Sequence, residues 1–461
     1  MMLLPMLVAL IYRESIFPFL YAILISAALG GLTVWLIKPK KKMFYAREGF
    51  LTVALTWVVM SLAGCLPFIF SGAIPNFADA FFETVSGFTT TGSTILTDVE
   101  VLPRGILFWR SFTHWIGGMG VIVFIMAILP SLGAGSVHIM KAEVPGTSFG
   151  KMAPKLKVTA KWLYYLYIAL TAIMLIFLLA GGMNLYDALI HTFGTAGTGG
   201  FSIYNASIGA YNNLYYEIVI TVFMLLFGVN FNIYFFLILR DLKSIWKSDE
   251  MWAYFGIVSA SILMIAWNIL SIYENFATAL RYSSFQVASI VSTAGFATAD
   301  FGQWPLFSQA ILVFLMFTGA CGGSTCGGMK ITRIVLMAKM FWRDLCRMVR
   351  PRSIKAIRLN GKPVEEETLT DLSAYLMAYM IIAAVSTLIV SLDCSDFTTA
   401  FTAMATCFNN IGPGLGAVGP VCNFAFFTDA TKYFLSFLML LGRLEIFPLL
   451  LAVTPILYRN K

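Results

Sequence analysis

Long apolar segments separated by short polar stretches run along the whole chain. Most of these segments hold about 20 residues, the length that an α-helix needs to cross the hydrocarbon core of a bilayer. The first two are Met1–Tyr12, which is short, and Ile16–Ile37, which leads into the basic run KPKKK. We interpret Met1–Tyr12 as the last part of a first leading helix and Ile16–Ile37 as a full second one.

Eight further apolar segments have the length of a span and pair off as an outward and a returning helix. The pairs are Phe50–Phe70 with Gly105–Leu129, Trp162–Ala180 with Leu214–Leu239, Trp252–Ile272 with Leu306–Met329, and Leu372–Leu392 with Tyr433–Leu457. The connection within each pair is about 30 to 40 residues long and becomes rich in small and polar residues, glycine among them. Loops of this length are uncommon as simple linkers, which indicates that these connections have structure of their own.

The four connections align without gaps over about fourteen residues. The aligned segments are DAFFETVSGFTTTG (79–92), DALIHTFGTAGTGG (187–200), YSSFQVASIVSTAG (282–295) and TAFTAMATCFNNIG (399–412). Each begins as an apolar helix of about two turns, which reaches about half-way through a bilayer, and ends at a glycine. This pattern predicts a re-entrant pore loop in each connection.

Extended backbone inside a membrane is tolerated only where it is packed in protein or lines a water-filled path. There its carbonyl oxygens can replace the water shell of an ion, and glycine permits the dihedral angles that aim them inward. The negative C-terminal ends of four short helices would also favour a cation. Any one such loop is more often an ordinary turn, but four in register indicate a pore.

The predicted fold is an all-α membrane protein with two leading helices and four helix–pore loop–helix repeats around a central pore. The predicted divisions are residues 1–47 for the leading helices, 48–160 for repeat 1 with pore loop 76–95 and a cytoplasmic linker, 161–251 for repeat 2 with pore loop 184–203, 252–366 for repeat 3 with pore loop 275–298, an interrupting loop 319–330 and a cytoplasmic basic helix, and 367–461 for repeat 4 with pore loop 395–414.

Composition supports a membrane location, because only 12% of the residues are charged and the mean hydropathy is +0.82, whereas soluble domains carry about 25% charged residues. The net charge of +8 does not indicate nucleic acid, because the basic residues cluster in alternate connections between apolar segments. These clusters are 38–47, 141–161, 240–247, 330–362 and the tail residues Arg459 and Lys461. By the positive-inside rule, we expect them to lie in the cytoplasm.

Two features interrupt the returning spans. The run GACGGSTCGGMK, Gly319–Lys330, breaks the third one, since each glycine costs about 1 kcal/mol in a helix; close packing through small residues is the alternative. In the last span, Arg443 and Glu445 are ionisable residues inside the membrane, which indicates either a functional charge or a structural pair satisfied mutually or by the backbone. The roles of Asp79, Glu83, Asp187, Arg110 and His114 stay open.

The segments TVSGFTTTGST, HTFGTAGTGGF, SIVSTAGFAT and FNNIGPGLG resemble the four pore loops of the TrkH/KtrB/HKT superfamily, and of its TrkH branch in particular. The resemblance implies a potassium uptake subunit of the bacterial inner membrane, a homodimer with a cytoplasmic nucleotide-binding regulatory subunit of the TrkA type. The filter residues it implies are Thr90, Thr91 and Gly92; Thr198, Gly199 and Gly200; Thr293, Ala294 and Gly295; and Asn410, Ile411 and Gly412.

The same resemblance implies that 319–330 is a gating loop across the ion path and that Arg443 lies beside that path. The gate residues it implies are Gly322, Gly323, Gly327, Gly328, Lys330 and Arg443. The basic segment after Lys330 predicts an amphipathic helix ending at Pro351, which binds either anionic lipid or the regulatory subunit.

Three other functions are alternatives to potassium uptake. Sodium selectivity is disfavoured because Gly92 keeps a glycine at all four filter positions, whereas a serine at the first position goes with sodium in plant relatives. Proton coupling needs titratable residues along the path, and the pore loops offer mainly Thr, Asn and Gly. No zinc motif, GxSxG triad or catalytic acidic pair indicates an enzyme. No organic cofactor is expected, K⁺ being the transported ion.

Overall fold

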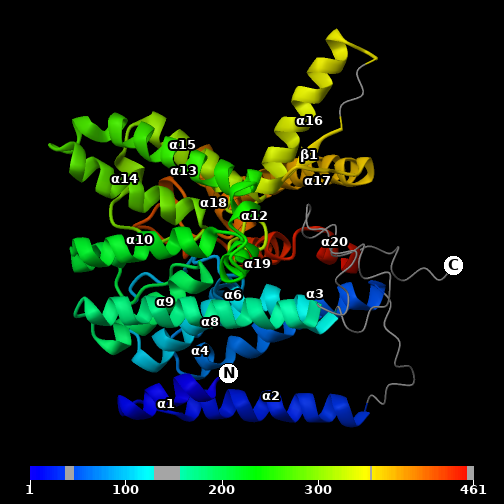
Figure 1. Ribbon diagram of the computed structural model, residues 1–461. Coiled ribbons are helices and arrows are strands. Elements are labelled where there is room, and N and C mark those ends of the chain that lie inside the picture. Colours follow the sequence, from blue (N-terminus) through cyan, green and yellow to red (C-terminus); the bar gives the residue numbers. More distant parts are fainter. Residues whose placement is uncertain (37–45, 129–155, 353–355, 454–461) are drawn as a thin grey trace.

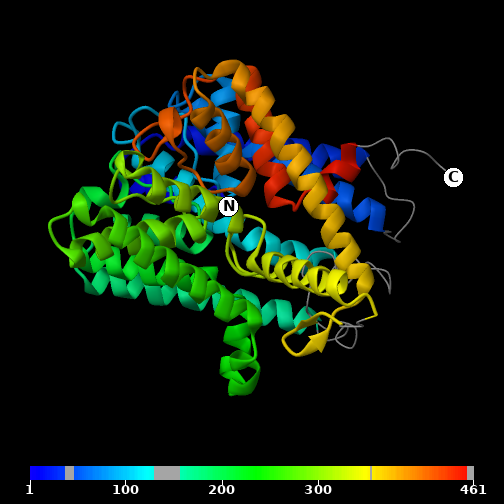
Figure 2. The same cartoon turned by 90° about the horizontal axis from the view of Figure 1, so that it is seen from above.

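The computed structural model describes residues 1–36, 46–128, 156–352 and 356–453. These residues are helical apart from loops and one short hairpin, and the longer helices lie side by side in both views (Figures 1 and 2). Within the described ranges, five helical segments are long and apolar enough to cross a membrane: Phe17–Leu36, Leu51–Phe70, Trp162–Ala180, Asp249–Ser271 and Glu366–Asp393. The chain is therefore a multi-pass membrane protein.

The helices follow the predicted order of two leading helices and four repeats. The leading helices are α1 (Leu3–Ile11) and α2 (Phe17–Leu36). Repeat 1 holds α3 (Ala46–Gly64), α4 (Leu66–Phe70), α5 (Phe77–Phe88) and α6 (Arg104–Ile128); repeat 2 holds α8 (Leu156–Ala180), α9 (Leu185–Gly197), α10 (Leu214–Gly228), α11 (Phe231–Ile238) and α12 (Leu242–Trp246); repeat 3 holds α13 (Asp249–Asn268), α14 (Phe276–Val291), α15 (Leu306–Thr318) and α16 (Ile331–Val349); and repeat 4 holds α17 (Glu366–Val390), α18 (Phe397–Asn409), α19 (Asp429–Arg443) and α20 (Phe447–Val453).

The leading helices are fastened to repeat 1 by one acidic side chain. Glu14, between α1 and α2, accepts the backbone N–H groups of Arg104 and Gly105 at 2.7 and 2.8 Å. The first N–H groups of a helix have no partner within the helix. Glu14 therefore caps α6 from outside its own helix and fixes where α6 begins.

Two returning spans differ from the prediction of one continuous helix. Leu214–Leu239 bends by 90° between α10 and α11, because Val229 is extended and the Asn230 side chain accepts the N–H of Asn232 and starts a new helix. Tyr433–Leu457 breaks after Arg443, where Glu445 and Ile446 have φ angles of 54° and 71°, and the chain restarts as α20. The predicted break at Gly319–Lys330 is present between α15 and α16.

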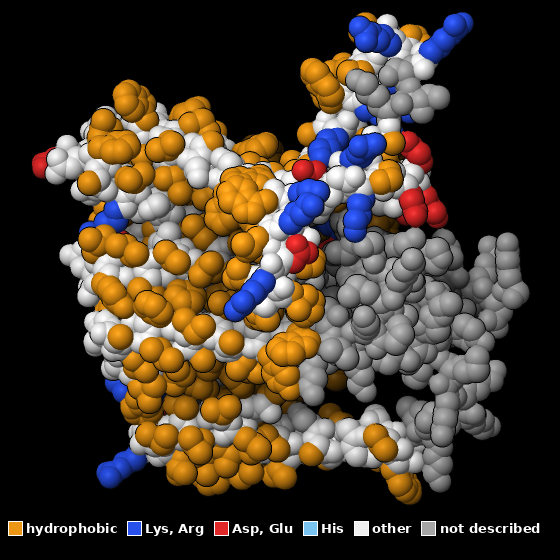
Figure 3. Space-filling model, viewed as in Figure 1, with side chains coloured by type: hydrophobic (Ala, Val, Ile, Leu, Met, Phe, Trp, Pro, Cys, Tyr) orange, Lys and Arg blue, Asp and Glu red, His pale blue; other side chains and the backbone are white. Residues whose placement is uncertain are grey.

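The basic segment of repeat 3 forms a helix that projects from the bundle (Figure 1). It is α16, and it ends before Pro351 as predicted. A two-residue antiparallel hairpin of β1 (Arg358–Leu359) and β2 (Lys362–Pro363) follows, with Arg358 opposite Pro363. Lys and Arg side chains gather over α16 and α12 on a face that is otherwise mostly hydrophobic (Figure 3). Residues 37–45, 129–155 and 454–461, which carry most of the other predicted cytoplasmic charge, lie outside the described ranges.

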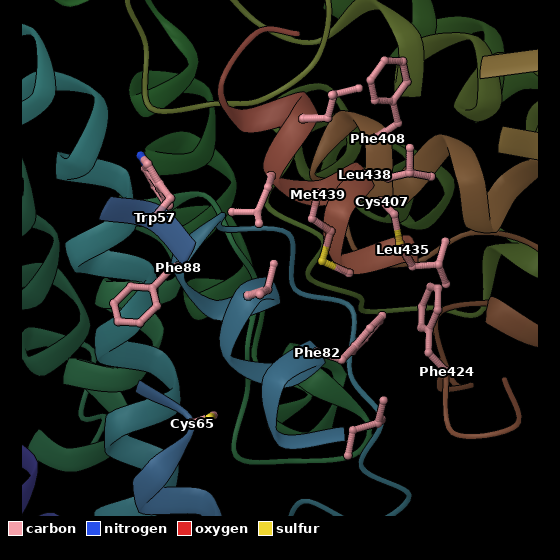
Figure 4. Close-up of a cluster of buried hydrophobic side chains, with 14 of the residues drawn as sticks. Trp57, Cys65, Phe82, Phe88, Cys407, Phe408, Phe424, Leu435, Leu438 and Met439 are labelled. Atoms are coloured by element: carbon pink, nitrogen blue, oxygen red, sulfur yellow. The ribbon is translucent and has the colours of Figure 1, made fainter. Parts of the chain in front are cut away.

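The largest hydrophobic core joins repeat 1 to repeat 4. Phe82 and Phe88 of α5 belong to one buried cluster with Phe408 of α18 and with Leu435 and Met439 of α19 (Figure 4). The first and last repeats are thus in contact, although they are far apart in the sequence. The four repeats therefore close on themselves.

One ion pair joins repeat 4 to repeat 1 and another joins repeat 2 to repeat 3, and the polarity of these two pairs is reversed. Lys432, the fourth residue of α19, lies 2.6 Å from Asp79 on α5. Glu217, the fourth residue of α10, accepts two hydrogen bonds of 2.6 Å from Arg281 on α14. Both pairs therefore link a returning helix to the short helix of the next repeat. An exchange of partners would bring like charges together.

We predict that Arg281→Met lowers the free energy of unfolding by about 2 kcal/mol, between the values for exposed and buried pairs. The reason is that Glu217, whose side chain is 4% exposed, would lose its only described cationic partner. The swap Glu217→Arg with Arg281→Glu should recover most of this loss. Melting of the detergent-solubilised protein measures it, with the exposed Arg347→Met as control. A single variant as stable as the parent would contradict the prediction.

Candidate functional site

The four short helices α5, α9, α14 and α18 start in the same way. Each follows an Asn or Asp at the N-cap position, namely Asn76, Asn184, Asn275 and Asp396. Three of these side chains accept an N–H of the first turn, at 2.7 Å for Asn76, 2.9 Å for Asn184 and 2.7 Å for Asp396. Side-chain oxygens at this position satisfy N–H groups that the helix leaves unpaired. The capping residues thus set the starting point of each short helix.

The four short helices also end in the same way. The residue that leaves each helix is left-handed, with φ of 57° at Thr90, 57° at Thr198, 55° at Thr293 and 56° at Asn410. The next N–H, of Thr91, Gly199, Ala294 or Ile411, donates to the carbonyl five residues earlier at 2.8–2.9 Å. A glycine with positive φ follows, at 82° for Gly92, 77° for Gly200, 76° for Gly295 and 101° for Gly412. One backbone turn is therefore built four times from different side chains.

These four turns meet one another in a closed ring. A Cβ atom at Gly92 would overlap the carbonyl oxygen of Gly199. By the same test, Gly200 abuts the carbonyl of Ala294, Gly295 abuts that of Ile411, and a Cβ at Gly412 would lie 2.9 Å from that of Thr91. Each glycine thus touches the next repeat, and the fourth touches the first. The structure brings all twelve sequence-predicted filter residues together at this ring.

The ring carries carbonyl oxygens that lack a hydrogen-bond donor. Within the described part of the chain, the carbonyls of Thr91, Gly199, Ala294 and Ile411 accept no hydrogen bond, and all four residues are buried. Buried carbonyls in proteins are nearly always paired, and an unpaired ring of carbonyl oxygens has the chemistry to bind a cation. The four glycines line one open hollow together with Ser202, Asn205 and Arg110.

A buried ion pair within repeat 1 stands behind the ring, and its arginine also contacts repeat 2. Arg110 Nε lies 2.5 Å from Glu83 Oε1, and Glu83 also accepts the N–H of Ile95 at 3.0 Å. Arg110 donates to the carbonyl of Ser202 at 3.0 Å, and its guanidinium group lies 3.5 Å from the centre of the Phe201 ring. The sequence left Glu83 and Arg110 without a role, because no spacing showed that they meet.

The loop Gly319–Lys330 lies against the ring. The N–H of Gly327 donates to Thr293 Oγ1 at 2.8 Å, and a Cβ at Gly327 would overlap the carbonyl of Asn409. Arg443 donates to the carbonyls of Thr325 and Gly117, both at 2.8 Å, and the Lys330 ammonium group donates to the carbonyl of Cys326. Two fixed positive charges therefore hold this half of the loop.

The other predicted gate residues lie in the rest of the loop. The N–H of Gly322 donates to Glu250 Oε1 at 2.5 Å, and Gly323 lies beside Asn230. Gly328 packs against Gly319, where the loop begins. All six predicted residues are thus in the loop or bound to it.

The predicted alternative of a mutual pair between Arg443 and Glu445 is wrong. Glu445 forms an ion pair with Arg333 of α16. The break after Arg443 gives Glu445 a positive φ and turns the chain, so the two side chains do not share one helix face. Arg443 is left to bind backbone carbonyls.

Among the described residues, no group of three His, Cys, Asp or Glu side chains is placed to hold a metal ion. The seven cysteines, including Cys394 and Cys422 on the predicted outer side, are free thiols.

Four re-entrant helix–turn units around a ring of backbone carbonyls, set in a bundle of membrane-length helices, define a multi-pass membrane protein of channel-like architecture. Residues 15–273 and 262–458 match the family model TrkH, described as a cation transport protein. The chain belongs to the TrkH family.

The similarity to known members covers almost the whole chain. The Trk system potassium uptake protein TrkH of Salmonella typhimurium is 40% identical over 467 residues, which include 100% of this chain and 96% of that protein. The Trk system potassium uptake protein TrkG of Escherichia coli is 32% identical over 100% of this chain and 95% of that protein. The crystal structure of the potassium transporter TrkH from Vibrio parahaemolyticus has a TM-score of 0.89 at 36% identity, covering 99% of this chain and 96% of that one. The resemblance and fold class inferred from the sequence are confirmed.

We predict that Gly442→Ala lowers the melting temperature, because a Cβ there would overlap the carbonyl of Phe408 and lie 3.0 Å from Asn410 Oδ1. Such overpacking costs about 1–3 kcal/mol. Gly256→Ala is the matched control, because it also lies within a helix but faces open space; its expected effect is neutral or stabilising by up to about 1 kcal/mol. Equal melting temperatures for the two variants would show that the close approach of α19 to α18 is not needed.

Proposed function

We propose that the chain is a channel-like potassium uptake subunit that selects K⁺ with the backbone carbonyls of its four pore loops. The filter residues are Thr90, Thr91, Gly92, Thr198, Gly199, Gly200, Thr293, Ala294, Gly295, Asn410, Ile411 and Gly412. The observation that carries the proposal is the closed ring in which each glycine abuts a carbonyl of the next repeat. Such oxygens can replace the water shell of a monovalent cation.

The electrostatics of the short helices support a cation as the occupant. Each helix ends immediately before the ring, so its negative C-terminal end faces the proposed ion site. Four such ends act together without adding a charged side chain. The named relatives are potassium uptake proteins and a potassium transporter, which supports K⁺ as the transported ion.

We propose further that Gly319–Lys330 is the gate. Its contacts with Thr293 and Asn409 place it against the ring. Lys330 and Arg443 put positive charge at the loop, and a like charge opposes a passing cation. Hydrogen bonds to carbonyls can break and re-form without rebuilding a helix, which suits a movable element.

The partners expected from the resemblance remain proposals. They are a second copy of the chain, a cytoplasmic nucleotide-binding subunit of the TrkA type and the lipids of a bacterial inner membrane. The relatives are named as parts of a Trk system, which supports further subunits. The projecting helix α16 exposes basic and aromatic side chains, including Trp342, which supports a partner surface there.

A proton-coupled cation transporter of the same fold is the alternative, and His114 is the observation that bears on it. Gly199 packs directly on the His114 ring. Its Nδ1 lies 2.8 Å from the carbonyl of Gly87, and its Nε2 accepts the N–H of Phe201 at 3.3 Å. Both ring nitrogens are thereby engaged in the neutral form. This arrangement favours a structural role for His114 over proton transfer. Sodium transport differs only in the ion preferred by the ring.

The test is ion flux in proteoliposomes under K⁺, Rb⁺, Na⁺ and Li⁺ gradients. We expect K⁺ to be preferred in the parent and the K⁺/Na⁺ permeability ratio to fall at least about ten-fold in Gly92→Ser, equivalent to ~1.4 kcal/mol. The added Cβ would press on the carbonyl of Gly199.

Gly182→Ser is the matched control, because Gly182 also has a positive φ, 89°, but faces open space. An unchanged K⁺/Na⁺ permeability ratio in a folded Gly92→Ser protein would show that Gly92 is not a filter residue. Selectivity for Na⁺ in the parent would overturn the proposal.

We predict that Arg443→Gln raises K⁺ flux at equal protein density by at least about ten-fold. The variant removes a positive charge and weakens two hydrogen bonds to carbonyls, and hydrogen bonds from charged groups contribute about 1.5–3 kcal/mol each. The exposed Arg347→Gln serves as control. Flux at the parent level with an unchanged melting temperature would show that Arg443 neither restrains the loop nor opposes the ion.

A further inference from the structure

The buried carboxylate of Glu250 collects three separate elements around the loop. Glu250 is in the first turn of α13 and is 6% exposed. Its Oε1 accepts the N–H of Gly322 in the loop at 2.5 Å and the hydroxyl of Thr332 at the start of α16. Its Oε2 accepts the amide of Asn230, at the bend between α10 and α11, at 3.1 Å. Within the described ranges, no cationic side chain pairs with Glu250.

A buried carboxylate without a cation is costly unless several donors satisfy it. Here the donors belong to three elements, and the N-terminal end of α13 adds a favourable dipole. Displacement of any of the three elements therefore removes a hydrogen-bond donor from a buried charged carboxylate. An uncharged residue would fill the space without this penalty, so the carboxylate makes the three positions depend on one another.

The adjacent residue Asp249 binds the projecting unit of α16 and its hairpin. Asp249 Oδ2 lies 2.6 Å from the Lys339 ammonium group and accepts the N–H of Asn360 at 3.1 Å. The N–H of Asp249 in turn donates to the Asn360 side chain at 2.9 Å. Lys339 lies seven residues after Thr332, so two turns of one face of α16 are held by two consecutive residues of α13.

The loop has a second set of contacts on its far half, which ends at Lys330. Gly327 binds Thr293 of the ring, and Thr325 binds Arg443. The near half, which begins at Gly319, is fixed to the α10–α11 bend. There the backbone N–H of Cys321 donates to the carbonyl of Gly228, and the backbone N–H of Phe231 donates to the carbonyl of Gly323. A shift of the near half is therefore transmitted along a few residues to the contacts at the ring.

We propose that Glu250 is a positioning residue that couples the α16–hairpin unit to the loop Gly319–Lys330, with Asp249 as the link to that unit. The inference rests on the proposed gate. Movement of α16 shifts the start of α13 and the hydroxyl of Thr332, which weakens the hold of Glu250 on Gly322 and releases the loop from the ring.

The chain carries its own reporters for this movement. Cys321 and Cys326 lie in the loop and are buried. Replacing the other five cysteines, Cys65, Cys346, Cys394, Cys407 and Cys422, leaves them as the only thiols. The rate at which a thiol reagent added from the side of α16 modifies them in proteoliposomes then measures how often the loop is released.

Glu250→Gln keeps the size of the side chain but turns one acceptor oxygen into an NH₂ group that faces the Asn230 amide. We expect it to raise the modification rate by roughly ten-fold, the factor expected for loss of a hydrogen bond to a charged group. The matched control Glu367→Gln, an exposed acid in the first turn of α17, should modify at the parent rate. Thr332→Val, which removes one donor at nearly constant shape, should act in the same direction and serves if Glu250→Gln does not fold.

The coupling itself is tested by Asp249→Asn alone and combined with Glu250→Gln. Asp249→Asn should raise the modification rate in the parent and add little once Glu250 is changed, because its effect passes through Glu250. Independent, multiplying effects would overturn the coupling, as would a parent rate in both Glu250→Gln and Thr332→Val.

The failure of the gate can be told apart from the failure of this inference. Deleting Gly322 to Gly327 should raise flux if the loop is a gate. If the deletion raises flux but Glu250→Gln leaves the modification rate unchanged, Glu250 is not a positioning residue. If Glu250→Gln raises the modification rate but the deletion leaves flux unchanged, Glu250 positions the loop and the loop is not a gate.

Discussion

A carbonyl oxygen buried without a hydrogen-bond donor is the constraint on which the rest of this structure depends. Inside a membrane, lipid cannot satisfy such an oxygen, so it must line a water-filled path or meet another positive partner. The chain leaves one such oxygen in each repeat at the same point of the same turn, and it packs the glycine of each repeat against the carbonyl of the next repeat. Every short helix, cap and returning span around the ring serves to hold these four turns together.

The four repeats share a backbone and differ in what supports it. Behind the first turn stands a buried ion pair, Glu83 with Arg110. Behind the second lies a histidine ring against Gly199, and the third takes a hydrogen bond from the loop through Thr293. In the fourth, the amide of Asn410 donates to Thr91 and to the carbonyl of Met439. If the loop is the gate, as proposed, equal geometry at the ring with unequal surroundings lets the loop and α16 act on one side of the ring without rebuilding the others.

Much of this arrangement could be predicted from the sequence, because hydropathy and length report burial in lipid directly. The four pore loops were aligned on their glycines, and the break at Gly319–Lys330 followed from its composition. What could not be predicted is the direction in which the chain turns at its breaks. Asn230 stands among apolar residues and gave no sign that α10 turns by 90° into α11. Proximity in the sequence made a pair of Glu445 with Arg443 one alternative, whereas the chain turns there and Glu445 pairs with Arg333. The role of Glu250 could not be predicted, because its partners are a backbone N–H, a hydroxyl and an amide from distant segments.

The reversed polarity of these two inter-repeat ion pairs determines which halves of the chain can assemble with each other. Both acids, Asp79 and Glu217, belong to the first half of the protein, and both bases, Arg281 and Lys432, belong to the second. The two halves are therefore electrostatic opposites at both seams where they join. Two copies of either half would meet acid to acid or base to base, so the pseudo-fourfold ring accepts only one half of each kind, as a heterodimer does.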